Sequence, residues 1–104
     1  MRISFSVNNV PIRLSEERFQ HIAARHREMK DSLLEILETI GNPDMVQKGD
    51  VGTLLAIKKF QKTPVSLSKF LVVVYKEEHS SSGFVLTAYY SNKPRNREIL
   101  WKKH

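Results

Sequence analysis

Hydrophobic and polar residues alternate along the first fourteen positions. Ile3, Phe5 and Val7 are separated by polar residues, an Asn-Asn pair follows, and the alternation resumes up to Leu14. A period of two indicates strands, and two asparagines between such runs favour a turn. This segment therefore predicts a weak strand or a hairpin.

Helical spacing replaces this alternation in the next segment. Ser15 is a favourable N-cap, and Glu16 and Glu17 suit the positive end of a helix dipole. Apolar residues then recur every three or four positions, which predicts a first helix from about Glu16 to about Glu28. A second apolar stripe predicts another helix, which ends at Gly41 before an Asn-Pro pair.

The remainder of the chain has the pattern of β-strands. The predicted strands are residues 45–48, 53–60, 70–76, 84–90 and 99–101. Phe70–Tyr75 is apolar on both faces, as in a central strand. Helices followed by strands predict a single α+β domain over residues 1–104, with the helices packed on one face of the sheet. An aromatic residue on the last strand, Trp101, is expected to close the core.

Charge and composition narrow the function classes. Seventeen Lys and Arg against eleven Asp and Glu give a net charge of +6, which favours nucleic acid, an anionic membrane or an acidic protein as partner. The absence of cysteine excludes disulfides and thiolate metal sites and fits a cytoplasmic protein. No apolar run is long enough to span a bilayer, so we expect no membrane association. The last segment is strongly basic, with Lys93, Arg95, Arg97, Lys102 and Lys103.

Two positions on the predicted elements carry side chains suited to chemistry. His26 continues the apolar stripe of the first helix and should point toward the sheet, whereas His21 should face solvent. On the strand 84–90, parity puts Thr87 and Tyr89 on the open face and Phe84, Leu86, Ala88 and Tyr90 in the core. Two simpler interpretations remain: a partly buried structural histidine satisfied by one hydrogen bond, and ordinary exposed β-formers.

These residue types suit metal-independent cleavage of RNA. In that reaction the 2′-hydroxyl attacks the adjacent phosphate, a base removes its proton, and cations stabilise the added negative charge. Histidine suits the proton transfer, and Arg or Lys suits the charge stabilisation. No metal-ligand, Walker A or dinucleotide motif occurs in the sequence, so we expect neither a metal nor an organic cofactor.

Five segments in order also resemble a known family. They are FQHIAARHREM, ILETIGNPDMV, LVVVY, FVLTAYYS and REILWKK, within roughly residues 18–103. Their order and spacing resemble the phage-type branch of the BECR nucleases, the grouping of barnase, EndoU, colicin nuclease and RelE-like folds. The resemblance implies two N-terminal helices packed on a four-stranded antiparallel sheet. It also implies a metal-independent endoribonuclease, often the toxin of a toxin–antitoxin pair.

The resemblance carries over to individual residues. Arg25 and His26 match the RH of the family's helix, and Thr87 and Tyr89 match the TAY of its strand. This implies proton transfer by His26, phosphate binding or ion pairing by Arg25, and substrate contact or orientation of the reacting groups by Thr87 and Tyr89. Arg27 stands where the family often has proline, which puts the end of the first helix in doubt.

The predicted site therefore has two parts. The catalytic residues are His26, Thr87 and Arg25, and the substrate-binding residues are Lys58, Tyr89, Arg95 and Arg97. The expected partners are RNA and an acidic antitoxin or immunity protein. The alternative is a non-catalytic nucleic-acid-binding module or a basic protein-interaction domain.

Overall fold

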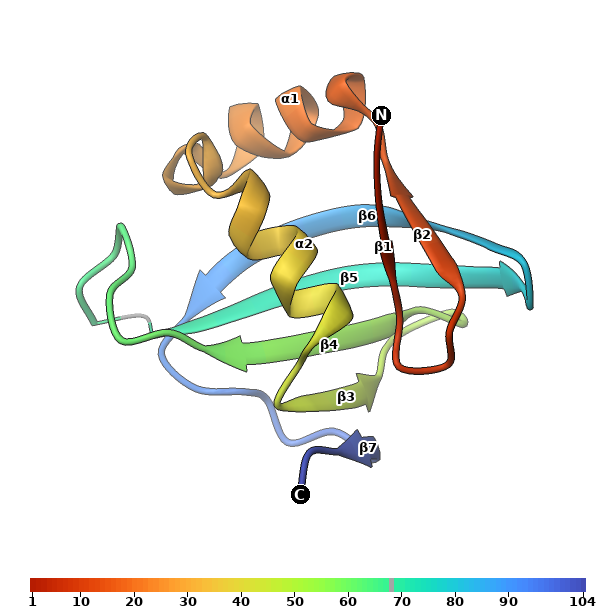
Figure 1. The fold of residues 1–104 in the computed structure, drawn as a ribbon. Helices are drawn as coiled ribbons and strands as arrows, with labels where there is room; N and C mark the ends of the chain where they lie inside the picture. The colour runs from red at the N-terminus through yellow and green to blue at the C-terminus, as the bar shows by residue number, and fades with distance from the viewer. Residues whose placement is uncertain (68) are drawn as a thin grey trace.

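A computed structural model describes residues 1–67 and 69–104, and in this part of the chain seven strands form one sheet (Figure 1). Their order is β1-β2-β6-β5-β4-β3-β7. The strands are β1 (Arg2–Phe5), β2 (Pro11–Leu14), β3 (Met45–Lys48), β4 (Leu54–Lys59), β5 (Phe70–His79), β6 (Ser82–Ser91) and β7 (Ile99–Lys102). The helices are α1 (Glu16–Arg25), the 3-10 turn η1 (Arg27–Met29) and α2 (Leu33–Gly41). None of them has the length and apolar composition needed to cross a membrane.

The predicted four-stranded antiparallel sheet is wrong. The first fourteen residues, predicted as a weak strand or a hairpin, form a hairpin with Asn9 at a positive φ of 62° in its turn. Its second strand, however, pairs in parallel with β6, with Ile12 opposite Gly83 and Arg13 opposite Phe84, so the sheet is mixed. β7 extends the sheet beyond β3 at the other side. Pairing between strands so distant in sequence depends on tertiary packing, and local residue patterns do not reveal it.

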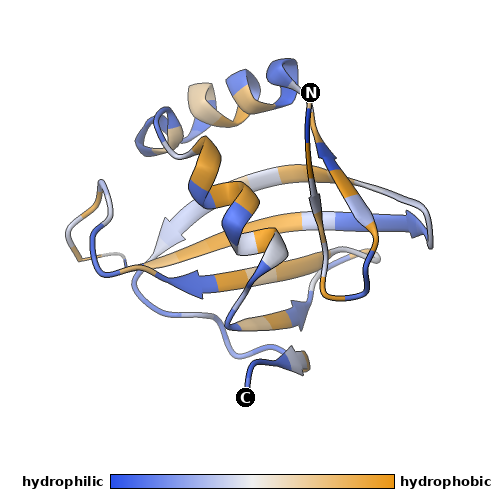
Figure 2. Ribbon diagram, in the orientation of Figure 1, coloured by the Kyte–Doolittle hydropathy of each residue, from blue (hydrophilic) through white to orange (hydrophobic). Residues whose placement is uncertain are grey.

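The helices cover one face of the sheet, where the main core lies. α2 crosses this face with Ile36 and Ile40 fully buried, and Figure 2 shows its apolar side together with the apolar middles of the central strands. Ser15 is the predicted N-cap of α1, since its Oγ accepts a hydrogen bond from the backbone N–H of Arg18 at 3.0 Å. The hydroxyl of Ser32, ahead of α2, lies 2.8 Å from that of Tyr90 and ties this helix to β6.

A second, smaller apolar layer lies on the opposite face. Leu55, Ile57 and Val72 form its buried centre, and Val74 and Tyr89 pack against them. The chain between β6 and β7 passes along this layer, where the Nε2 of Gln47 donates to the carbonyl oxygen of Arg95 at 2.9 Å. Two adjoining cavities open along this layer.

Trp101 does not have the predicted role. It lies on the outermost strand β7, paired with Val46, and its side chain is 36% exposed. Leu100 forms a bulge in this pairing, because Val46 and Gln47 are opposite Trp101 and Ile99. A short, bulged last strand forms the edge of the sheet rather than its core.

Candidate functional site

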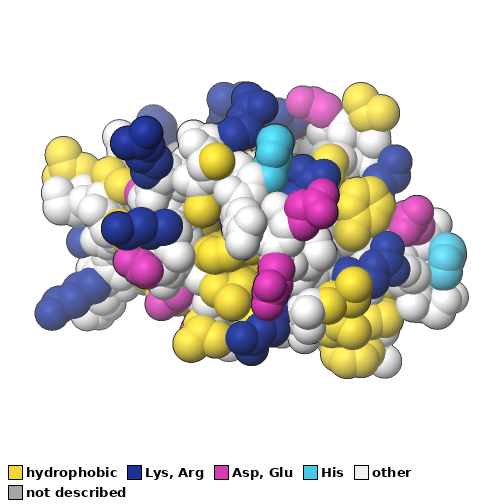
Figure 3. Space-filling view, turned by 90° about the horizontal axis from the view of Figure 1, so that it is seen from above, with side chains coloured by type: hydrophobic (Ala, Val, Ile, Leu, Met, Phe, Trp, Pro, Cys, Tyr) yellow, Lys and Arg dark blue, Asp and Glu magenta, His cyan; other side chains and the backbone are white. Residues whose placement is uncertain are grey.

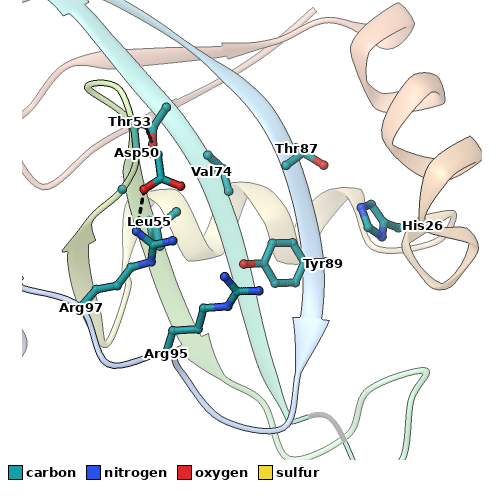
Figure 4. A pocket seen from close by; sticks show the side chains of 10 residues that line it. His26, Asp50, Thr53, Leu55, Val74, Thr87, Tyr89, Arg95 and Arg97 are labelled. Carbon is teal, nitrogen blue, oxygen red and sulfur yellow. Dashed lines mark hydrogen bonds and ion pairs between the residues drawn. The ribbon is translucent and has the colours of Figure 1, made fainter.

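A cavity of about 500 Å³ opens on the sheet face opposite the helices. Leu55 and Val74 form the apolar part of the cavity wall, and the polar side chains come from four separate segments (Figure 4). They are the end of α1 with His26, the turn between β3 and β4 with Asp50 and Thr53, β6 with Thr87 and Tyr89, and the chain before β7 with Arg95 and Arg97. Five of the seven predicted site residues therefore line one cavity.

His26 reaches this cavity by a route that helical periodicity did not predict. α1 ends at Arg25, and His26 is its C-cap with φ −129° and ψ 87°, its N–H still bonded to the carbonyl oxygen of Ile22 at 2.8 Å. The predicted continuation of the helix to Glu28 is wrong, since a 3-10 turn follows and buries Met29 completely. β2 pairs only with the start of β6, which allows His26 to lie against the later part of that strand.

The imidazole of His26 faces Tyr89. The two ring centres are 5.9 Å apart, with their planes inclined by 37°. His26 is half-buried, and its ring makes no hydrogen bond to any residue within 1–67 and 69–104. A structural histidine would be held by a hydrogen bond, and the described part of the chain provides none. Both ring nitrogens can therefore bind a ligand.

Thr87 and Tyr89 lie on the open face, as parity predicted, but the core side of β6 was predicted wrongly. Val74 is opposite Thr87 and Tyr75 is opposite Val85, so Leu86 is an extra residue in a β-bulge. The bulge shifts the alternation by one position. Val85 is therefore buried in the main core with Ala88 and Tyr90, whereas Phe84 and Leu86 are not part of it.

An ion pair joins two walls of the cavity. Arg97 donates from Nη1 to Oδ1 of Asp50 at 3.1 Å. This hydrogen bond and the charge of Arg97 lower the pKa of Asp50, and the same carboxylate raises the pKa of Arg97. Asp50 was not among the predicted site residues, because a Gly-Asp dipeptide is typical of a turn and gives no sign of a partner arginine.

The turn that carries Asp50 is held locally. Thr53 donates to the carbonyl oxygen of Asp50 from its backbone N–H at 3.1 Å and from its hydroxyl at 2.7 Å. Val51 and Gly52 both have positive φ, 51° and 76°. A positive φ is unfavourable for a β-branched residue, so the hydrogen bonds and the ion pair hold Val51 in a strained conformation.

The two arginines differ in how they are held. Arg97 is half-buried and fixed by Asp50, and its Nε lies buried without a hydrogen-bond partner among the residues described. Arg95 is exposed, and the hydrogen bond that holds it within the described part of the chain is made by its backbone carbonyl, which accepts from Gln47. Figure 4 shows both guanidinium groups on one side of Tyr89 and His26 on the other. An anion above Tyr89 would meet cations on one side and an imidazole on the other.

Two predicted site residues lie elsewhere. Lys58 is on the helix side of the sheet, where its Nζ donates to the carbonyl oxygen of Asn42 at 3.0 Å and lies 3.8 Å from Glu38. Strand alternation puts its neighbour Ile57 on the open face instead. Arg25 is exposed in the last turn of α1, outside the cavity lining.

On the face seen from the α1 side, the positive charge is not gathered in one continuous patch. In the view from the α1 side, Lys and Arg side chains are interspersed with Asp and Glu (Figure 3). Within residues 1–67 and 69–104, no cluster of three or more His, Asp and Glu side chains has an arrangement that could hold a metal ion. The groups at the cavity are therefore a histidine, hydroxyls, two arginines and one paired carboxylate.

Comparisons with protein-family models, with curated proteins and with solved structures find no match. The resemblance to BECR nucleases stays a prediction, and the fold it implied differs from the one observed. The geometry of the cavity is therefore the basis on which a function can be assigned.

Proposed function

We propose that this protein is a metal-independent endoribonuclease, which cleaves RNA by attack of a 2′-hydroxyl on the adjacent phosphate. The observation that carries the proposal is that His26, Tyr89, Arg95 and Arg97 line the same cavity. A proton-transferring group beside cations matches what this reaction requires. The net charge of +6 adds long-range attraction for a polyanion.

Each group has a distinct role in the proposed reaction. His26 accepts the proton of the 2′-hydroxyl as its oxygen bonds to phosphorus. The bond from phosphorus to the 5′-oxygen breaks, which leaves a 2′,3′-cyclic phosphate, and water protonates the departing oxygen. Arg95 and Arg97 stabilise the negative charge on the phosphorane, and Thr87 offers a hydroxyl to the substrate.

Tyr89 favours single-stranded RNA as the substrate. Its ring lies between His26 and the arginines, so a base stacked on it would bring the attached phosphate within reach of both. Stacking on aromatic side chains is a common means of binding unpaired bases.

The same feature favours the second candidate, an RNA-binding module that does not cleave. In either case an acidic protein placed over the arginines would block the cavity, which is how an antitoxin would act.

A single-turnover assay on a single-stranded RNA with EDTA present tests the proposal. His26→Gln keeps a polar side chain and removes the proton-transferring group, and we expect cleavage to fall by at least ~100-fold. His21→Gln is the matched control, because His21 is exposed on α1 and outside the cavity. RNA binding should survive in both variants. A parent protein that binds RNA and cleaves none would support the second candidate. Equal cleavage by parent and His26→Gln would remove His26 from the reaction.

A further inference from the structure

A second cavity of about 130 Å³ adjoins the first beneath the chain between β6 and β7. The two cavities share Leu55, Tyr89 and Arg95 in their linings. The wall of the second is apolar along the sheet, where Ile57 and Val72 join Leu55. Lys93 and Pro94 line it from the connecting chain. An apolar slot beside an aromatic ring and a cation suits a flat heterocycle attached to an anionic chain.

One polar side chain in this slot is unsatisfied. Gln47 on β3 is 3% exposed, and its Nε2 donates to the carbonyl oxygen of Arg95 at 2.9 Å. This bond fixes the orientation of the amide, because only the NH₂ group can donate. The amide oxygen Oε1 is buried and accepts no hydrogen bond from the part of the chain that is described. Buried acceptors are normally paired, so an unpaired one in a cavity wall indicates a missing donor.

We propose that the second cavity binds an unpaired nucleobase that carries an exocyclic amino group, and that Gln47 Oε1 accepts a hydrogen bond from it. This inference depends on the proposed function, since it assigns a base specificity to the same RNA-binding site. Tyr89 contacts the face of the base, and the attached phosphate extends into the first cavity toward Arg95.

Comparing the binding of cytosine with that of uracil tests this arrangement most directly. Both are single rings of nearly equal size, and they differ where cytosine has an amino donor and uracil a carbonyl oxygen. In uracil, a carbonyl oxygen would face Gln47 Oε1, and two hydrogen-bond acceptors repel each other. Uracil could offer its N3–H to Oε1 only by shifting within the slot, and the two carbonyls that flank N3 would weaken that bond by secondary repulsion. The amide NH₂ cannot turn to meet uracil without losing its bond to Arg95.

Equilibrium binding of 2′-deoxy oligocytidylate and 2′-deoxy oligouridylate, followed by fluorescence anisotropy, tests the base site. These probes lack the 2′-hydroxyl and cannot be cleaved by the proposed reaction. We expect the cytosine probe to bind about 10-fold more tightly, as for one good base contact. Gln47→Met, of similar length and without donor or acceptor, should reduce the ratio of the two affinities to about one. Gln20→Met, at an exposed position of α1, should leave the ratio unchanged.

A probe built on pyrimidin-2-one, which is cytosine without its amino group, tests the same contact in the unaltered protein. It should bind about as weakly as the uracil probe. Equal affinity of the parent for all three probes would overturn the base site, even if RNA is cleaved. A preference for cytosine that persists in a folded Gln47→Met variant would overturn the role of Gln47. Cytosine-selective binding without cleavage of RNA would support the base site and overturn the endoribonuclease.

Discussion

Tyr89 on β6 contacts His26 at the end of α1, with ring centres 5.9 Å apart, and it also lines both cavities on the open face. A single aromatic ring therefore joins the proposed proton-transferring group to the proposed base site. Few other positions could affect binding and cleavage together. Its neighbour Tyr90 also borders the second cavity, but its hydroxyl lies on the helix side and bonds Ser32, so removing that hydroxyl leaves the open face unchanged.

Replacing Tyr89 should separate stacking from hydrogen bonding. Tyr89→Ala should weaken the binding of single-stranded RNA by about 1–3 kcal/mol, the usual range for one base–aromatic contact. Tyr89→Phe keeps the ring and should bind within about twofold of the parent if stacking dominates. Equilibrium binding at fixed salt measures both. The control is Tyr90→Phe, which should bind RNA normally and lose about 1 kcal/mol of stability with its hydrogen bond to Ser32. Normal RNA binding by Tyr89→Ala would exclude stacking at this position.

Removing the cavity arginines should alter the salt dependence of RNA binding. Each contact between a cation and a phosphate of a single strand contributes about 0.7 to the slope of log affinity against log salt. Arg95→Gln and Arg97→Gln should each lower the slope by about that amount. Arg25→Gln removes an exposed cation outside the cavity and should change the slope less. Slopes that fall equally for all three variants would indicate diffuse attraction rather than a phosphate site.

The sequence predicted the elements of this fold better than their assembly. Ser15 began the first helix as predicted, and the strand Met45–Lys48 has the predicted bounds. The sheet was wrong because the parallel pair Ile12–Gly83 joins segments that show no sign of each other in sequence. The bulge at Leu86 was invisible for a related reason, since it is fixed by the partner strand β5.

The candidate site was predicted in part, and its misses have separate causes. His26, Thr87 and Tyr89 were found from residue type and position, although His26 reaches the cavity as a helix cap and not along a helical stripe. Lys58 was assigned to the site because alternation alone does not say which face of a strand the helices cover. Gln47 gave no sequence signal, since a glutamine between Val46 and Lys48 in a short strand is ordinary until its partner Arg95 is known.

Glycine at position 83 is required where β6 lies between β5 and β2. A Cβ at Gly83 would lie 2.4 Å from the carbonyl oxygen of Lys76 and 2.6 Å from Cδ1 of Ile12. One neighbour is backbone and the other is fully buried, so neither moves easily. Gly83→Ala should therefore destabilise the protein by about 3 kcal/mol, the upper part of the range for overpacking. Denaturant unfolding measures it.

The comparison for this variant is Gly41→Ala. There the nearest atom to a new Cβ is the side-chain oxygen of Ser4 at 3.0 Å, and alanine suits the end of α2 better than glycine. The two effects oppose each other, so the net change should stay within about 1 kcal/mol. A Gly83→Ala variant as stable as Gly41→Ala would contradict the close contacts of Gly83 with β5 and β2.

Tyr75 should make the fold sensitive to alkaline pH. Its side chain is fully buried, and its hydroxyl has no hydrogen-bond partner in the described chain. Burial, assisted by the charge of Glu77, raises the pKa of this hydroxyl well above its ordinary value. The folded protein therefore keeps the Tyr75 proton at a pH where the unfolded chain, with a tyrosine pKa of about 10, loses it. The stability linked to this proton is complete below pH ~10 and falls above it by about 1.4 kcal/mol per pH unit.

Tyr75→Phe isolates this effect, because it removes the ionisable group and keeps the ring. At neutral pH the variant should be at least as stable as the parent, since the hydroxyl it loses is buried and unpaired. Above pH ~10 the difference in unfolding free energy should grow in favour of the variant by about 1.4 kcal/mol per pH unit. Tyr90→Phe controls for the other tyrosine whose pKa is raised by burial, although its hydrogen bond to Ser32 opposes that shift. Denaturant midpoints measured from pH 7 to pH 11 give the comparison. If the stability of the parent and that of Tyr75→Phe changed with pH in parallel over that range, the Tyr75 hydroxyl would ionise as readily in the folded protein as in the unfolded chain.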